Sequence, residues 1–184
     1  MNTKNILELL KKDHREFEKI ISRLEQMSDE EETDEREELF SDLKQKIVAH
    51  SKAEEQAFYD RLEREEEAED LIQEAHSEHE EVEECLEEME SMSPGERGWE
   101  IKLSDLKQDL KHHIREEESE VFAKAREFLD QDEFRTIGQE FLEIKAMYGI
   151  DEDEGETSRG RKTPRRATRG TKDQRGPGHR RSAS

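Results

Sequence analysis

Apolar residues in this chain recur at steps of three and four, which is the spacing of one face of a helix. In residues 68–92 the stripe runs without a break through Ile72, Ala75, His79, Val82, Leu86 and Met89. Leu, Ile, Val and Phe number only 34 of 184 residues, a share typical of disordered chains at a net charge of −21, but all 34 precede Asp151. Because these residues are concentrated and periodic, this part of the chain can bury a narrow helical core. No convincing strand alternation competes with it.

The pattern predicts four long helices and a shorter fifth one. Their expected ranges are 5–27, 35–65, 68–92, 96–129 and 132–147. Ser93-Pro94-Gly95 forms a turn between two of them, and Gly149 is suited to end the last. Since short connections between long amphipathic helices favour antiparallel neighbours, we expect an all-α fold: an up-down-up-down four-helix bundle with a short fifth helix.

Histidines occupy positions on the apolar faces of all four long helices. Two of these histidines have a glutamate four residues later, which lies on the same face roughly 6 Å along the helix axis. Burying several imidazoles and carboxylates without a partner is strongly disfavoured. We therefore predict a buried two-metal site whose ligands are His14, His50, Glu54, His79, His113 and Glu117.

An internal repeat supports this prediction, because each half of the chain has one helix with a single histidine and one with His-x3-Glu. Nitrogen and oxygen ligands without a thiolate suit iron, manganese or zinc. His112 points about 100° away from His113 and is not expected to be a ligand. His76, one turn before His79, is expected to lie outside the ligand set but close to it.

The chain resembles the bacterial hemerythrin-like (HHE cation-binding) family over residues 1–148. The matching motifs are Asp13-His14, His50-x3-Glu54-Glu55, Glu78-His79-Glu80 and His113-x3-Glu117-Glu118, with Phe58-Tyr59 and Val121-Phe122 after the two His-x3-Glu motifs. The resemblance implies a non-haem di-iron centre with Glu54 and Glu117 bridging the metal ions. It also implies a small ligand or oxidant, namely O2, NO or peroxide.

One departure from the family bears on function. Oxygen-carrying members have an additional histidine four residues before the ligand in the third helix, and here that position is Ala75. Fewer histidines leave more open coordination positions. The resemblance therefore points away from simple oxygen carriage and towards reaction with a diatomic molecule, sensing or iron handling, and it leaves open whether the protein is an enzyme.

The C-terminal residues have a different composition. Residues 157–184 hold ten of the 31 Lys and Arg but only one of the 52 Asp and Glu, Asp173, and they lack Leu, Ile, Val and Phe. We expect residues 149–184 to form a disordered basic tail. Phosphate neutralisation makes nucleic acid a candidate partner of residues 157–184.

Several classes of protein are excluded or disfavoured. The single cysteine, Cys85, rules out an intrachain disulfide, and no apolar run approaches the roughly 20 residues of a membrane span. The N-terminal residues lack the apolar region of a signal peptide. We expect a soluble cytoplasmic protein, either a monomer or a dimer.

Two other functional hypotheses remain open. The first is a metal-responsive structural or regulatory module, in which metal binding stabilises a weak bundle and the basic tail binds a partner or nucleic acid. The second is a purely structural bundle, for which replacing His50 and His113 by alanine leaves bound metal unchanged.

Overall fold

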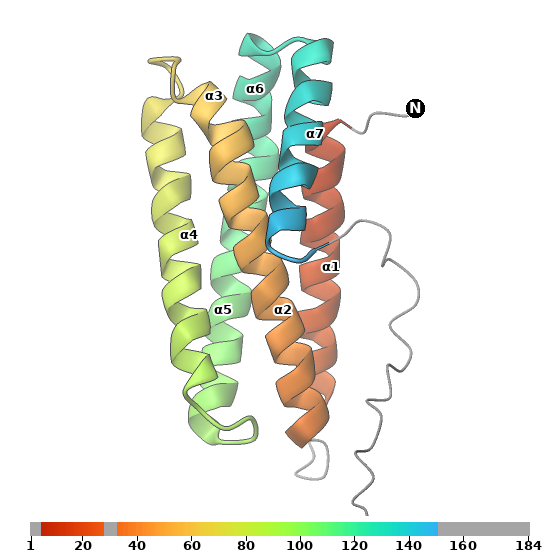
Figure 1. The fold of residues 1–184 in the computed structure, drawn as a ribbon. Helices are drawn as coiled ribbons and strands as arrows, with labels where there is room; N and C mark the ends of the chain where they lie inside the picture. The colour runs from red at the N-terminus through yellow and green to blue at the C-terminus, as the bar shows by residue number, and fades with distance from the viewer. Residues whose placement is uncertain (1–4, 28–32, 151–184) are drawn as a thin grey trace, which may run out of the picture. The chain divides into compact units, whose positions relative to one another are not determined.

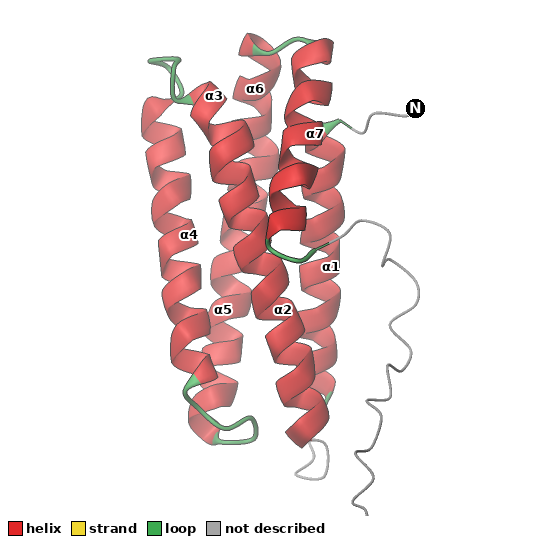
Figure 2. Cartoon of the chain, viewed as in Figure 1, coloured by secondary structure: helices red, strands yellow, loops and turns green. Residues whose placement is uncertain are grey.

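The computed structural model describes residues 5–27 and 33–150. Within these residues every regular element is a helix, so the expected all-helical class is confirmed (Figure 2). The chain divides into two units, and the described residues belong to the first, Met1–Glu152. The basic tail expected over 149–184 lies outside the described residues except for Gly149 and Ile150.

The elements follow the expected segments closely. They are α1 (Ile6–Gln26), α2 (Thr33–Glu54), η2 (Glu55–Tyr59), α3 (Asp60–Leu62), α4 (Glu69–Glu90), α5 (Arg97–Glu116), η3 (Glu117–Val121), α6 (Phe122–Phe128) and α7 (Gln131–Met147). Two segments expected to be uninterrupted α-helices, 35–65 and 96–129, each contain one π-helical turn, η2 or η3. The periodicity of the apolar residues gave no indication of these turns.

The helices form a bundle in which α1, α2, α4 and α5 each pack against two of the others (Figure 1). Following the ribbon, each of these long helices runs opposite to the one before it. The fifth helix, α7, lies alongside α1 and α2. The interior of the bundle is therefore lined by all four long helices, and one side of it is covered by a fifth.

The apolar core consists of two clusters. One includes Leu10, Ala53, Ala75 and Val121, and the other includes Phe17, Ile47, Val82 and Leu110. Along its helix, each of the four predicted histidine ligands lies between a residue of one cluster and a residue of the other. These neighbours are three to eight positions away. The bundle thus has a buried polar layer between two apolar ones.

Local signals in the sequence fix the ends of α7. Asp130 caps the helix by accepting hydrogen bonds from the N–H groups of Asp132 (2.8 Å) and Glu133 (2.9 Å), and Glu133 returns a bond to the Asp130 N–H. At the other end Gly149 adopts a positive φ of 82°, as expected of a helix-ending glycine. The Ile150 N–H then reaches the Lys145 carbonyl.

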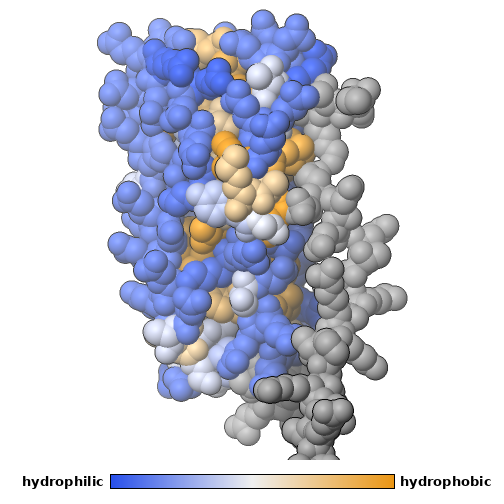
Figure 3. Space-filling model, in the orientation of Figure 1, coloured by the Kyte–Doolittle hydropathy of each residue, from blue (hydrophilic) through white to orange (hydrophobic). Residues whose placement is uncertain are grey.

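The surface reflects the charged composition. The face in Figure 3 is mostly hydrophilic, and hydrophobic side chains appear on it only in small groups. Among the described residues the large hydrophobic side chains that are exposed are Ile101, Met147 and Tyr148. None of the described helices combines the length and apolarity that a bilayer crossing requires.

Candidate metal centre

The six predicted ligands lie together in the buried polar layer, which we call the ligand layer. Each is at most 5% exposed, although all six are polar or ionisable. They come from α1 (His14), α2 (His50, Glu54), α4 (His79), α5 (His113) and η3 (Glu117). Since ionisable groups are rarely buried unless they are paired, this layer is the strongest candidate for a functional site in the described residues.

The π-helical turns adjoin the two glutamates. Glu54 immediately precedes η2 and Glu117 opens η3. In each turn a backbone N–H reaches the carbonyl five residues earlier: Asp60 donates to Glu55, and Phe122 donates to Glu117. Turns of this kind occur frequently at functional sites. Here they occupy equivalent places in the two halves of the internal repeat.

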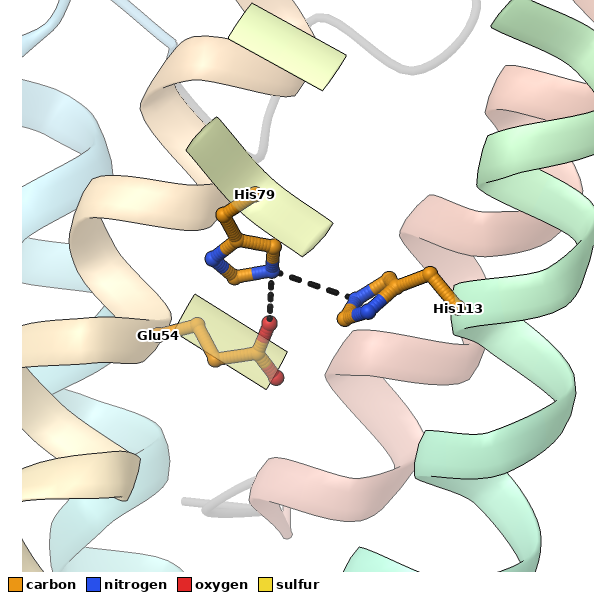
Figure 4. Close-up of side chains that lie close together, drawn as sticks. All are labelled: Glu54, His79 and His113. Carbon is orange, nitrogen blue, oxygen red and sulfur yellow. Dashed lines mark hydrogen bonds and ion pairs between the residues drawn. The ribbon is translucent and has the colours of Figure 1, made fainter. Parts of the chain in front are cut away.

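Inside the ligand layer the Nε2 atoms of the histidines point towards one another and towards the glutamates. Figure 4 shows the part formed by Glu54, His79 and His113, in which His79 Nε2 lies 3.5 Å from Glu54 Oε2 and 3.1 Å from His113 Nε2. These three side chains can hold one metal ion.

The other two histidines approach the same glutamates. His50 Nε2 lies 3.4 Å from Glu54 Oε2, and His14 Nε2 lies 3.1 Å from Glu117 Oε2. Glu54 is therefore close to two histidines from different helices, and Glu117 is close to a third. This arrangement is compatible with carboxylates shared between two metal ions.

The Nδ1 atom of every histidine in the layer is bound by a carboxylate at the outer side of the ring. The four pairs are His14 with Glu118 (3.0 Å), His50 with Asp13 (3.1 Å), His79 with Glu55 (3.1 Å) and His113 with Glu78 (2.9 Å). An ionised carboxylate only accepts hydrogen bonds, so Nδ1 donates and Nε2 is directed inward, where a neutral ring offers its lone pair. Histidines that bind metal ions are commonly oriented in this way.

These four acids, which we call the outer carboxylates, form a closed ring around the bundle. Each is a sequence neighbour of one ligand but binds the histidine of another helix. Asp13, beside His14, accepts the hydrogen bond of His50 in α2. Glu55, beside Glu54, accepts that of His79 in α4. All four acids stand in the motifs that resemble the family, but the sequence alone assigns them no role. Their signal was an acid adjacent to a ligand in all four segments.

Buried carboxylates raise the pKa of two histidines in the layer. Burial opposes a charge on His14, but Glu117 and Glu118 outweigh it and raise the pKa of His14 to about 10. Burial likewise opposes a charge on His79, yet Glu54 and Glu55 raise the pKa of His79 to about 9. The acids around these two rings thus favour a positive charge on them.

The pKa values of Glu117 and His113 are shifted as well. Burial, followed by the charge of Glu54, raises the pKa of Glu117 well above its ordinary value. Burial lowers the pKa of His113, and the positive charge of His79 contributes to this shift. A metal ion supplies positive charge without a proton and would therefore satisfy the same carboxylates.

Several atoms of the layer fit a metal because they lack a well-formed hydrogen bond within the protein. All four carboxylate oxygens of Glu54 and Glu117 and the Nε2 atoms of His14 and His50 are buried without a hydrogen-bond partner of acceptable geometry. Buried polar atoms normally have one. Imidazole nitrogen with carboxylate oxygen is the donor set of iron, manganese and zinc, so the residues present fit such an ion.

A small cavity adjoins the four histidines, and neither Glu54 nor Glu117 lines it. Its volume is about 10 Å³, close to the room that one water-sized molecule occupies. The lining consists of the four histidines of the layer, Ser51 and the apolar side chains of Phe17, Ile47, Val82, Leu110 and Ile114. Ile114 also lines a surface cleft of about 650 Å³ between α1 and α5, so its side chain borders both the cavity and the cleft.

Nearby histidines lie outside the layer, as expected. His112 is exposed and pairs with Glu78 and Glu116, both at 3.4 Å. His76 Nε2 donates a hydrogen bond to the carboxylate of Glu63, at 2.9 Å. The ring of Tyr59 lies between His76 and His79, stacked on the latter, so His76 is close to the layer but not part of it.

Among the comparisons with known proteins, the family model agrees with a metal-binding site. The family model of the hemerythrin HHE cation binding domain matches residues 5–125. A DNA nickase from Nostoc sp. (strain PCC 7120) is 28% identical over 142 residues, which are 77% of this chain and 39% of the relative. The chain therefore spans about two fifths of the length of this relative. No solved structure matches the chain.

Proposed function

Because this chain belongs to the hemerythrin HHE cation-binding family, we propose that its ligand layer holds two iron ions and that the protein binds, senses or reacts with a diatomic molecule or peroxide. The terminal ligands are His14, His50, His79 and His113, and the bridging ligands are Glu54 and Glu117. Iron supplies redox electrons and open coordination positions for O2, NO or peroxide. Manganese and zinc suit the same donors.

The cavity beside the histidines is the observation that carries the choice of ligand. It is too small for an organic substrate, at about 10 Å³, and its wall beyond the imidazoles is largely apolar. Apolar walls disfavour ions and bulk water but accept a neutral diatomic molecule. The outer carboxylates keep the four Nε2 atoms directed inward while the small ligand enters and leaves.

Iron loading under anaerobic conditions tests this proposal. We expect two iron ions per chain, and a new ferric absorption band when the oxidised protein receives azide. Replacing both His50 and His113 by alanine is expected to abolish metal binding. Full iron occupancy with no optical response to azide, O2 or NO contradicts the diatomic role. Unchanged metal content in the double variant contradicts the ligand assignment and favours a purely structural bundle.

Access to the cavity gives an independent test. Ile114 is half-buried and borders both the cavity and the surface cleft. Ile114→Ala is expected to speed azide binding to the iron-loaded protein in stopped-flow measurements, while Ile114→Trp slows it. Equal rates in both variants would show that the ligand reaches the iron by another path.

The second candidate function is a metal-responsive regulatory module whose basic tail binds nucleic acid. Two observations favour it: ten Lys and Arg in residues 157–184, and a relative that is named a DNA nickase. Neutralised phosphates release counterions, so such binding weakens as salt rises. Salt-dependent retention of the full chain on duplex DNA, lost when residues 157–184 are deleted, is the expected result. Retention that survives the deletion excludes the tail.

A further inference from the structure

Lys145 of α7 places a positive charge in the interior of the bundle. Its side chain is 6% exposed, and its ammonium nitrogen lies 2.5 Å from Asp13 Oδ2 and above the ring of Phe141. Among the described residues it is the only buried lysine. Burying an ammonium group has a high desolvation cost that an ion pair offsets only when its geometry is good. The position of Lys145 therefore calls for an explanation.

The carboxylate of Asp13 is shared between this lysine and the ligand layer. The same oxygen that receives the Lys145 ammonium also accepts the hydrogen bond from His50 Nδ1, at 3.1 Å. A continuous line of contacts thus runs from α7 through α1 to the histidine of α2.

The other three outer carboxylates have cationic neighbours as well, but these are looser and exposed. Lys11 lies 3.5 Å from Glu118, Lys52 lies 3.5 Å from Glu55, and His112 lies 3.4 Å from Glu78. The exposed fractions of these three side chains are 39%, 32% and 52%. Water screens such pairs and lets their side chains move. Among these four ion pairs, only that of Asp13 and Lys145 is buried and has a short distance between its charged atoms.

We propose that Lys145 is a positioning residue of the metal centre: it holds the Asp13 carboxylate in the orientation that fixes the imidazole of His50. This inference rests on the proposed function. It makes α7 part of the centre, although α7 contributes no ligand. It also makes the two metal positions unequal, because the position that includes His50 depends on a buried ion pair and the other depends on carboxylates that reach solvent.

Competition titration of metal into wild-type protein and Lys145→Met tests the inference, with Fe(II) under anaerobic conditions and with Zn(II) in air. We expect wild type to bind two ions, and Lys145→Met to bind one of them roughly 10–100-fold more weakly, the usual effect of losing an orienting partner. The slowly exchanging Nδ1 proton of His50 in the metal-free protein is expected to disappear from NMR spectra of the variant. A purely structural lysine would not change that signal.

Matched variants separate positioning from packing. Lys52→Met removes the exposed lysine of another outer carboxylate and is expected to leave both affinities unchanged. Ile137→Ala loosens α7, through a side chain that is 1% exposed, without touching the ion pair, and is expected to lower the melting temperature only. Asp13→Asn is expected to reproduce the affinity loss, and adding Lys145→Met to it is expected to cause no further loss.

The outcomes are distinguishable. Equal affinities in wild type and Lys145→Met overturn the inference, as does an equal loss in Ile137→Ala. If Lys145→Met does not fold, Asp13→Asn decides: unchanged affinities in that variant overturn the inference, and weakened binding of one ion supports it. A wild-type chain that does not bind two ions overturns the proposed function, and this inference with it.

Discussion

A buried imidazole has two nitrogens that need partners, and in this protein the two sides of each ring are treated differently. The outer nitrogen of each ligand-layer histidine donates to a carboxylate from the neighbouring helix, whereas the inner nitrogen faces other potential ligands. One residue of separation decides which task an acid performs: Glu54 lies in the layer, and Glu55 beside it orients His79. The chemistry of single residues is therefore set by the helix face.

The outer carboxylates give the first prediction. Glu78→Gln keeps the size of the side chain but removes the negative charge of the group that accepts the hydrogen bond from His113 Nδ1. We expect metal affinity to fall roughly 10–100-fold, as for other orienting partners of metal-binding histidines. Competition titration measures this. Glu74→Gln on the same helix is the control, because Glu74 is exposed and the Nδ1 atoms of the four histidines bond to other acids. Equal affinities in the two variants would contradict the orienting role.

At the scale of elements, the π-helical turns show what the apolar period cannot reveal. The stripe through residues 35–65 and 96–129 predicts uninterrupted helices, yet each contains one wider turn beside a glutamate of the ligand layer. Such a turn changes the register of everything that follows it by a fraction of a turn. Neither turn contains a glycine or a proline that would signal it in the sequence.

A buried arginine joins three helices at the opposite end of the bundle from η2 and η3. Arg36 of α2 donates to Glu100 at 2.7 Å and to the Leu24 carbonyl at 3.1 Å, and it stacks on the ring of Trp99. We expect Arg36→Ala to lower the free energy of unfolding by about 2–4 kcal/mol, since it leaves a buried carbonyl unpaired and removes a cation–π contact.

Urea denaturation of Arg36→Ala beside Arg23→Ala checks this prediction. Arg23 joins α1 to Glu35 of α2 on the surface, with a side chain that is 60% exposed. Exposed pairs contribute about 0–1 kcal/mol. Comparable losses of stability in the two variants would show that the buried contacts of Arg36 contribute no more to the free energy of unfolding than an exposed ion pair does.

The cap of α7 gives a prediction about pH. Hydrogen bonds from the N–H groups of Glu133 and Asp132 lower the pKa of Asp130. A carboxylate whose pKa is lower in the folded state stabilises that state above its unfolded pKa, and loses the effect as pH falls through its folded pKa. Asp130→Asn keeps a capping side chain without the charge.

Near pH 7 the melting temperature of wild type is therefore expected to be higher than that of Asp130→Asn. This difference in melting temperature is expected to shrink below about pH 4. Thermal melts of both proteins over this range provide the measurement. The comparison between variants cancels the effect of the many other acids. A difference that does not change with pH would mean that the charge of the cap is unimportant.

At the scale of the whole molecule, the ligand layer interrupts the core. Apolar clusters lie on either side of it, so a stretch of the interior that other bundles fill with leucine is filled here with imidazoles and carboxylates. The oxygens of Glu54 and Glu117 have histidine nitrogens at 3.1–3.5 Å but no hydrogen bond of acceptable geometry, so we expect a bound cation to stabilise this part of the bundle. Metal binding and folding are consequently expected to be linked.

This linkage gives the last prediction. A ligand that binds only the folded state stabilises it by about 4 kcal/mol at a thousandfold excess over its dissociation constant. For a domain of this size that corresponds to a rise in melting temperature of roughly 10 °C. Calorimetry of metal-loaded and chelated protein measures the rise. The variant that carries both His50→Ala and His113→Ala is expected to show none, and equal melting curves for loaded and chelated wild type would contradict the linkage.

The sequence by itself determined the helical class, the approximate helix ranges and the set of six side chains that share buried faces. These properties are local, because the period of an α-helix fixes which residues of one segment lie on one face. Family motifs such as His50-x3-Glu54-Glu55 added the expected chemistry. The match to residues 5–125 confirms the family.

Tertiary structure alone decided which partner each of these groups meets. Asp13 could be placed beside His14 from the sequence, but its bonds to His50 and to Lys145, 132 residues later, depend on which helices are neighbours and how each is rotated. The same holds for the cavity beside the histidines, whose apolar walls come from four helices. Period constrains the face of one helix, whereas contacts between helices depend on the packing of the whole bundle.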